Sequence, residues 1–253
     1  MSIQILWGLA LLALVCEYVD STLGMGYGTT LTPILLLMGY EPAQIVPSVL
    51  LSEFLTGILA GVLHHELGNV NLKPGSRPFK VAMALAACSV VGTLVAVNIA
   101  VNVPKWMLKT YIGVLVLAMG ISILLTIGRT FGFSWKKVIG LGLLAAFNKG
   151  ISGGGYGPLV CGGQVLAGMG EKEAIGITSL AEGLVCIVGV IAYWATGNGG
   201  VDWGLAPSLI LGAVLSVPFA AFSVSKIPVH KMRWAIGIAV TVLGLWTLAK
   251  VVF

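Results

Sequence analysis

The sequence predicts an all-α membrane protein that crosses the bilayer several times and consists of two inverted repeats. Three observations predict this fold class: the apolar composition, an internal repeat, and two glycine clusters that each precede a short apolar segment. The 253 residues are 58% hydrophobic and 9% charged, and their mean hydropathy is +1.03. Soluble proteins carry about 25% charged residues, which cover their surface. The composition therefore indicates a polytopic membrane protein rather than a soluble one.

Polar residues and prolines mark the ends of ten apolar segments. Glu17 and Asp20 close the first segment, and Pro104 precedes the fifth. A basic linker at 129–137 separates two halves, 1–128 and 129–253, which we expect to be the two repeats. We expect the segments at 3–19, 29–39, 43–65, 81–103 and 106–127 in the first half, and at 138–147, 158–168, 173–195, 205–224 and 232–253 in the second.

Two of these segments, 29–39 and 158–168, are too short to cross a bilayer as helices. Each has 11 residues, whereas a transmembrane helix needs about 20. We therefore expect about eight full spans plus two short elements that form broken or re-entrant helices. Irregular backbone at membrane depth is tolerated where it is buried in protein or lines a cavity.

The second half repeats the plan of the first. At a constant offset of 129 residues, ten of the 35 positions from 24 to 58 are identical without a gap. The identities include Tyr27 with Tyr156 and Glu53 with Glu182. With five elements in each half, the second half enters the membrane from the opposite face. This arrangement is an inverted repeat, which is common among secondary transporters.

The distribution of basic residues predicts the orientation. Loops on one side of the predicted topology carry ten of the 14 Lys and Arg residues, and the positive-inside rule places these loops in the cytoplasm. Both termini are then outside the cytoplasm. The ten residues are Lys73, Arg77, Lys80, Arg129, Lys136, Lys137, Lys172, Lys226, Lys231 and Arg233.

Two glycine clusters directly precede the short elements and are the candidate substrate site. Backbone N–H groups at the start of a helix carry partial positive charge and favour an anion. In inverted-repeat transporters, such helix starts meet near the middle of the membrane. The alternative is that the glycines serve close helix packing. The candidate residues are Gly24, Gly26, Tyr27 and Gly28 in the first cluster, and Gly153, Gly154, Gly155, Tyr156 and Gly157 in the second.

Lys149 lies four residues before Gly153, in the same glycine-rich stretch, and has no acidic residue near it in the sequence. A buried ammonium group in a membrane needs a partner or water. We expect Lys149 to neutralise an anionic substrate. Asn148, Ser152, Ser21 and Thr22 can supply neutral hydrogen-bond donors. The alternatives are that its side chain reaches an interface, or that it pairs with Glu17 or Asp20.

Four acidic residues are candidates for proton coupling. Glu53 and Glu182 occupy matched positions within long apolar segments, and Glu17 and Asp20 flank the first glycine cluster. Carboxyl groups inside a membrane are rare and mark functional sites. Burial favours their protonated form, so they can take up a proton during transport. The alternative for Glu53 and Glu182 is a structural, protonated acid bonded to the backbone.

Other classes of function find little support in the sequence. No nucleophile–base pair indicates an enzyme, and the cysteines lack the spacing of a metal site. The glycine-rich stretch lacks the Gly-Lys-Ser/Thr order of a nucleotide phosphate loop. The basic residues are scattered over loops, which argues against a nucleic-acid surface. We expect no cofactor, no metal and no nucleic-acid partner, and leave the oligomeric state open.

The repeated clusters, each followed by a short element and a glycine-containing turn, resemble the TauE/SafE family of sulfite exporters. The second cluster, Ser152 to Pro158, is the closest match, whereas the first has Met25 in place of a glycine and Thr29 in place of the proline. The resemblance implies a bacterial inner-membrane protein that transports sulfite, thiosulfate, sulfoacetate or other organosulfonates, often by export. Together, these features predict a secondary transporter with alternating access around a midplane anion site. The alternative is a passive anion channel.

Overall fold

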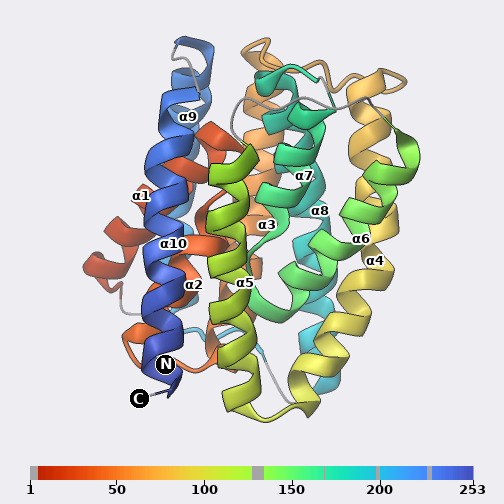
Figure 1. The fold of residues 1–253 in the computed structure, drawn as a ribbon. Helices are drawn as coiled ribbons and strands as arrows, with labels where there is room; N and C mark the ends of the chain where they lie inside the picture. The colour runs from red at the N-terminus through yellow and green to blue at the C-terminus, as the bar shows by residue number, and fades with distance from the viewer. Residues whose placement is uncertain (1–4, 127–133, 168, 198–199, 227–229, 253) are drawn as a thin grey trace.

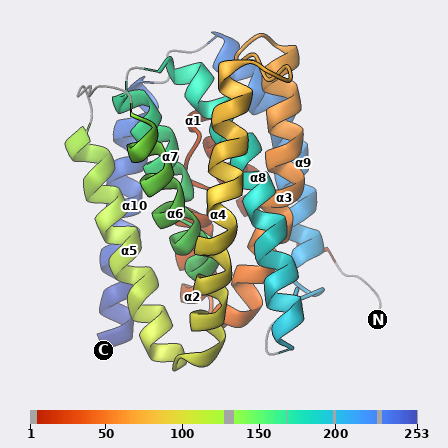
Figure 2. The same ribbon diagram turned by 90° about the vertical axis from the view of Figure 1, so that its right-hand side faces the viewer.

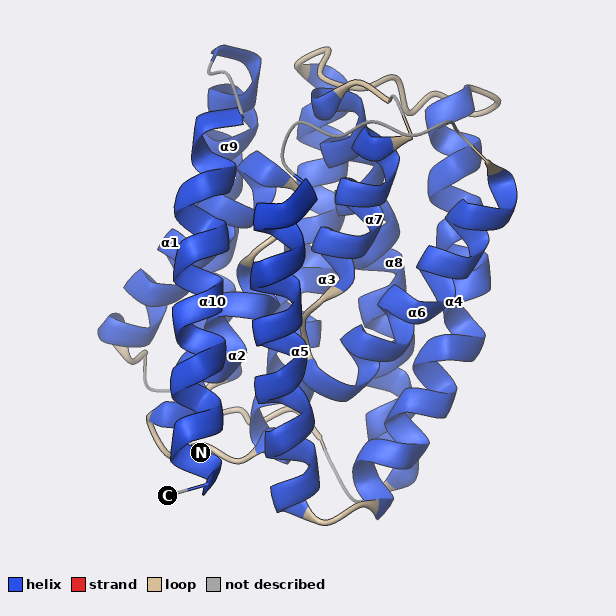
Figure 3. Ribbon diagram, viewed as in Figure 1, coloured by secondary structure: helices blue, strands red, loops and turns tan. Residues whose placement is uncertain are grey.

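The protein is a bundle of α-helices. The computed structural model describes residues 5–126, 134–167, 169–197, 200–226 and 230–252, and these residues contain no β-strand (Figure 3). Each of the ten expected apolar segments forms a helix. The helices are α1 (Trp7–Leu23), α2 (Tyr27–Leu37), α3 (Pro42–Glu66), α4 (Arg77–Asn102), α5 (Lys105–Thr126), α6 (Trp135–Ser152), α7 (Tyr156–Leu166), α8 (Glu171–Thr196), α9 (Ala206–Lys226) and α10 (His230–Val252).

The number of long apolar helices differs from the expected eight spans. Among the described residues, five helices are long and apolar enough to cross a membrane: α3, α4, α5, α8 and α9. The shorter apolar stretches are Tyr27–Leu37, Val138–Ser152 and Val240–Ala249. The expected segment ends at residues 3, 127 and 168, and the boundary between the halves at 128, lie outside the described residues.

The outer surface of the bundle is apolar, as lipid contact requires. Large hydrophobic side chains on several helices are exposed, among them Val91 on α4, Trp194 on α8 and Phe219 on α9. Soluble proteins rarely expose contiguous apolar surface of this kind.

Connections alternate between two ends of the bundle. The α3–α4 loop lies at the upper end in Figures 1 and 2, and the α4–α5 turn lies at the lower end. The starts of α4, α6 and α8 and the end of α9 are also at the upper end. Exposed basic residues at these helix ends are Arg77, Lys80, Lys136, Lys172 and Lys226. The lower end carries Lys105 at the start of α5.

The packing partners of the two halves correspond. Helix α1 packs against α9, and α6, at the same place in the second half, packs against α4. Likewise α3 contacts α9 while α8 contacts α4. The remaining large contacts join equivalent helices, α3 with α8 and α5 with α10.

The chain breaks between α1 and α2, and again between α6 and α7, inside the bundle (Figure 3). Gly24 ends α1 at φ 68° and Gly153 ends α6 at φ 73°. Gly26 and Gly155 then precede the next helices at φ 139° and 80°. Side chains disfavour such positive φ values, which explains why glycine stands at these matched positions. The predicted breaks are confirmed.

The two breaks lie back to back and run in opposite directions. A Cβ atom on Gly28 would overlap the carbonyl oxygen of Gly153 and lie 2.9 Å from the Cα of Gly154. A Cβ atom on Gly157 would overlap the carbonyl oxygen of Gly24. Residues 24–28 and 153–157 are therefore in direct backbone contact, with the start of each segment beside the end of the other.

Candidate functional site

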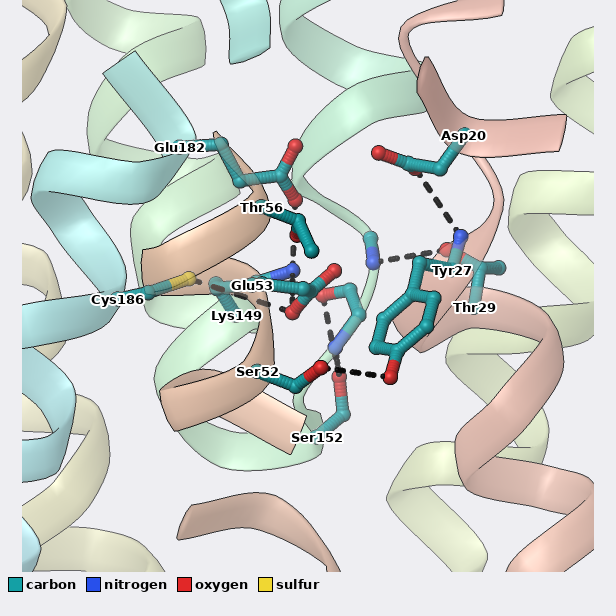
Figure 4. A network of polar contacts seen from close by, with 12 residues as sticks. Asp20, Tyr27, Thr29, Ser52, Glu53, Thr56, Lys149, Ser152, Glu182 and Cys186 are labelled. Carbon is teal, nitrogen blue, oxygen red and sulfur yellow. Dashed lines mark hydrogen bonds and ion pairs between the residues drawn. The ribbon is translucent and has the colours of Figure 1, made fainter. Parts of the chain in front are cut away.

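Lys149 lies beside the breaks and is fully buried, with 0% of its surface exposed. It is near the end of α6, four residues before Gly153, whose N–H bonds its carbonyl oxygen. Its ammonium nitrogen is 2.5 Å from Oε2 of Glu53 on α3 and 2.6 Å from Oε1 of Glu182 on α8 (Figure 4). The two glutamates at matched positions of the halves thus converge on one lysine.

The sequence left the partner of Lys149 open, with Glu17 and Asp20 as the alternatives to a substrate anion. In the structure, Lys149 instead forms ion pairs with Glu53 and Glu182. An offset of 129 residues also matches Asp20 with Lys149. An acid and a base therefore occupy equivalent positions before the two breaks.

Asp20 caps the start of α2. Its Oδ1 atom accepts a hydrogen bond of 3.0 Å from the backbone N–H of Tyr27. A carboxylate at a helix N-terminus satisfies a free N–H group and interacts favourably with the helix dipole. Asp20 thereby takes the place in the first break that an anionic ligand would take.

Glu17 lies one turn earlier on α1 and is held by two hydroxyl groups. Ser21 donates to Oε1 at 2.6 Å and Thr56 donates to Oε2 at 3.2 Å. The hydroxyls come from α1 and α3, so Glu17 joins the first break to the helix that carries Glu53. Both oxygens of this buried carboxyl group thus have a hydrogen-bond donor, as buried polar groups require.

A small cavity, the acidic cavity, lies among these side chains. Its volume is about 10 Å³, roughly the space of one water molecule. Oε1 of Glu53, which lines the cavity, is buried and has no hydrogen-bond partner among the described residues. The cavity is lined by Glu17, Asp20, Ser21, Glu53, Thr56, Gly57, Ala60, Ser179 and Glu182.

The backbone amides of the second break are bonded to side chains of the protein itself. Gly155 N–H donates to Thr29 Oγ1 at 3.0 Å, and Gly154 N–H donates to Ser152 Oγ at 3.1 Å. The space next to these amides, lined by Thr29, Thr32 and Ser152 among others, is too small for a water molecule, with a free volume of about 0 Å³. The site is therefore closed, and a substrate anion cannot enter it without a rearrangement.

The geometry combines two helix breaks, a buried cation and several buried acids in the interior of an apolar helical bundle. A family model, Sulfite exporter TauE/SafE, matches residues 9–247 of the chain. The chain belongs to the TauE/SafE family.

A curated relative of this TauE/SafE protein is "Probable membrane transporter protein YtnM" of Bacillus subtilis (strain 168). It is 26% identical over 241 residues, which cover 90% of this chain and 77% of the relative. No solved structure matches the chain. The family and this relative show a membrane transporter.

The structure separates the predicted site residues of this TauE/SafE protein into two groups. Glu17, Asp20, Glu53, Lys149 and Glu182 surround or adjoin the acidic cavity. The others form the breaks or support them. Asn148 Oδ1 accepts from Tyr111 Oη on α5 at 2.5 Å, Tyr27 Oη bonds Ser52 Oγ at 2.9 Å, and Tyr156 is fully buried in the core.

Apart from Ser21, sequence reasoning missed the hydroxyl and thiol groups around the acids. Thr56 lies three residues after Glu53, and Ser179 three residues before Glu182, so each shares a helix face with its acid. Cys186, four residues after Glu182, donates to Glu53 Oε2 at 4.0 Å. A search for polar residues at helical spacing from each buried acid would have found them. Among the described residues, no three His, Cys, Asp or Glu side chains could hold a metal ion.

Proposed function

We propose that this TauE/SafE protein is a proton-coupled secondary transporter that exports a small sulfur-containing anion. Sulfite, thiosulfate, sulfoacetate and other organosulfonates are the candidate substrates. The observation that carries the proposal is the buried Lys149, held between Glu53 and Glu182 beside two helix breaks. The family name, Sulfite exporter TauE/SafE, supports the class of anion and the direction.

The charges of the site explain why protons accompany the anion. Two carboxylates and one ammonium group carry a net charge of about −1 when all are ionised. A substrate anion that binds Lys149 must displace at least one glutamate. Because a buried, unpaired carboxylate is costly, the displaced glutamate takes up a proton. Oε1 of Glu53, buried and without a hydrogen-bond partner among the described residues, is a ready position for that proton.

The broken helices supply the second part of the anion site. The N–H groups of Gly154 and Gly155 are held by the hydroxyls of Ser152 and Thr29. A sulfonate or sulfite oxygen would replace these hydroxyls as acceptor and meet the positive end of α7. The remaining cluster residues, from Gly24 to Gly28 and from Gly153 to Gly157, shape the breaks that allow this approach.

Alternating access follows from an inverted repeat. The corresponding packing partners of α1–α5 and α6–α10, and the antiparallel contact of their breaks, support two repeats at 1–128 and 129–253. In such transporters, one repeat moves against the other around a fixed midplane site. We propose about eight spans, with α2 and α7 as the two short elements.

The distribution of charge supports an orientation with the upper end in the cytoplasm. Exposed basic residues gather at that end, and the positive-inside rule would place both termini outside in a bacterial inner membrane. A membrane potential that is negative inside drives net negative charge outwards by about 2.3 kcal/mol per charge per 100 mV. A dianion and one proton together carry one negative charge, so the membrane potential favours their export.

Transport by purified protein in liposomes tests the proposal. The fluxes of labelled sulfite and labelled taurine should differ. For the wild type, we expect a sulfite flux that saturates and depends on protons. Lys149→Gln should reduce that flux at least about tenfold, because it removes a charge-assisted contact. Glu53→Gln and Glu182→Gln should weaken the pH dependence, whereas the exposed control Glu66→Gln should leave both properties unchanged.

Three results would contradict the proposal. Normal sulfite flux in Lys149→Gln would remove the lysine from the site. An unchanged pH dependence in both glutamine variants would remove the proton coupling. Flux that does not saturate and does not respond to a proton gradient would indicate a passive anion channel.

A further inference from the structure

A second, larger cavity lies at the lower end of the bundle and has no role in the function proposed above. Its volume is about 210 Å³, compared with about 10 Å³ for the acidic cavity. The start of α3, the turn from α4 to α5 and the end of α8 surround it at this end (Figure 2). A small solute therefore fits in this cavity without rearrangement of the breaks.

Most of the residues that line this cavity are apolar. Lys105 supplies the charged group, and its side chain is 74% exposed. Lys105 and Lys109 both face Glu41, at 3.9 and 3.2 Å, so two positive charges meet one negative charge. The rim thus keeps an excess positive charge. The apolar lining includes Pro42, Ala100, Val101 and Leu108.

A hydrogen bond connects the inner wall of the cavity to the residue that follows the buried lysine. Tyr193 lines the cavity and is itself buried. Its hydroxyl donates to the carbonyl oxygen of Gly150 at 2.8 Å, and Gly150 directly follows Lys149. One aromatic side chain therefore connects the wall of the larger cavity to the segment that carries the charged site.

We propose that this cavity is an outer binding site for an organic anion with a short hydrocarbon chain. The anionic group lies at Lys105, and the hydrocarbon chain lies against Val101, Leu108 and Ala100. An inorganic anion gains little there, because it has no apolar group to bury. This inference rests on the proposed function and adds a second site that prefers organosulfonates over sulfite.

Calorimetric titration of the purified protein with methanesulfonate and propane-1-sulfonate tests the site. Each buried methylene group contributes up to about fourfold in affinity, so the wild type should bind propane-1-sulfonate at least about threefold more tightly. Val101→Phe fills the cavity and should abolish this preference. Lys105→Gln should weaken binding of propane-1-sulfonate about fivefold, as expected for loss of one exposed charge contact.

Matched controls separate the cavity from general effects. Val91→Phe places the same residue on an exposed part of the same helix, where Val91 is 63% exposed. Lys136→Gln removes an exposed lysine at the opposite end of the bundle. Both controls should keep the preference for the longer chain, and both Val101→Phe and Lys105→Gln should keep normal flux of sulfite.

The outcomes distinguish this inference from the proposed function. Equal affinity for the two sulfonates in the wild type, or a preference that persists in Val101→Phe, overturns the outer site. An affinity for propane-1-sulfonate that does not fall in Lys105→Gln indicates a site for hydrocarbon alone and also overturns it. If sulfite flux still depends on Lys149 in these cases, the proposed function stands while the outer site falls.

Discussion

Lys149 and its two glutamates form a buried charged triad whose members depend on one another. The lysine is fully buried, and Glu53 and Glu182 are 3% and 5% exposed. A buried ion pair contributes little net stability, but removal of one partner leaves an uncompensated charge. Each member is therefore held in place by the others.

Loss of the lysine alone should destabilise the protein strongly. We expect Lys149→Met to lower the free energy of unfolding by about 3–5 kcal/mol, because two buried carboxylates lose their cation. The triple variant Lys149→Met, Glu53→Gln, Glu182→Gln should regain most of this loss. Thermal unfolding in detergent measures both variants against Lys136→Met, an exposed control. A triple variant less stable than Lys149→Met would show that the glutamates do not depend on the lysine.

The sequence identified the members of this triad but not their contacts. Lys149, Glu53 and Glu182 each stood out as charges within apolar segments. Their meeting depends on how α3, α6 and α8 pack, and helix periodicity does not determine packing between helices far apart in the chain. The sequence therefore offered Glu17 and Asp20 as partners, because these acids lie near a glycine cluster.

At the scale of the elements, the two breaks are a single unit because each fills the space that the other leaves. Their backbones touch at Gly28 with Gly153 and Gly154, and at Gly157 with Gly24. Side chains at these positions would push the breaks apart. The glycines thus serve the close packing that the sequence offered as an alternative, as well as the positive φ values of the breaks.

Substitution of Gly28 should therefore disrupt the unit. We expect Gly28→Ala to abolish transport and to destabilise the protein, because its methyl group would overlap the backbone of the second break. Gly162→Ala, on α7 with no atom within 4 Å of the added Cβ, should be tolerated. Flux in liposomes and thermal unfolding compare the two variants. Normal flux in Gly28→Ala would show that the breaks are not packed in this way.

The starts of the short helices show where sequence reasoning loses accuracy. We expected helices from residues 29 and 158, but α2 and α7 begin at Tyr27 and Tyr156. The earlier glycines, Gly26 and Gly155, already provide the reversal, so the helices begin directly after them. Pro158 is consequently the third residue of α7 rather than the first, where its missing N–H is still not needed.

At the scale of the whole molecule, the apolar composition and the repeat predicted the ten helices and their order. The expected count of about eight full spans is not confirmed, since five of the described helices are long and apolar enough to cross a membrane. The breaks end α1 and α6 after 17 and 18 residues. Which helices pack together was not predictable, because apolar faces of similar composition specify no unique partner.

Accessibility of single cysteines tests the orientation. The two variants are Lys105→Cys and Lys73→Cys, and both positions are exposed. Each is made in a Cys88→Ser background, in which the remaining cysteines, Cys16, Cys161 and Cys186, are buried. A membrane-impermeant maleimide should label residue 105 in intact cells and residue 73 only after permeabilisation. Labelling of residue 73 in intact cells would place the basic end outside the cytoplasm.

Proton uptake upon anion binding tests whether a bound anion displaces a glutamate from Lys149. Calorimetric titrations of purified protein with sulfite, in two buffers of different ionisation enthalpy, give the number of protons taken up per bound anion. We expect about one proton per anion for the wild type, and a smaller number for the double variant Glu53→Gln, Glu182→Gln. Tight anion binding by the wild type without proton uptake would show that the anion does not displace a glutamate from Lys149.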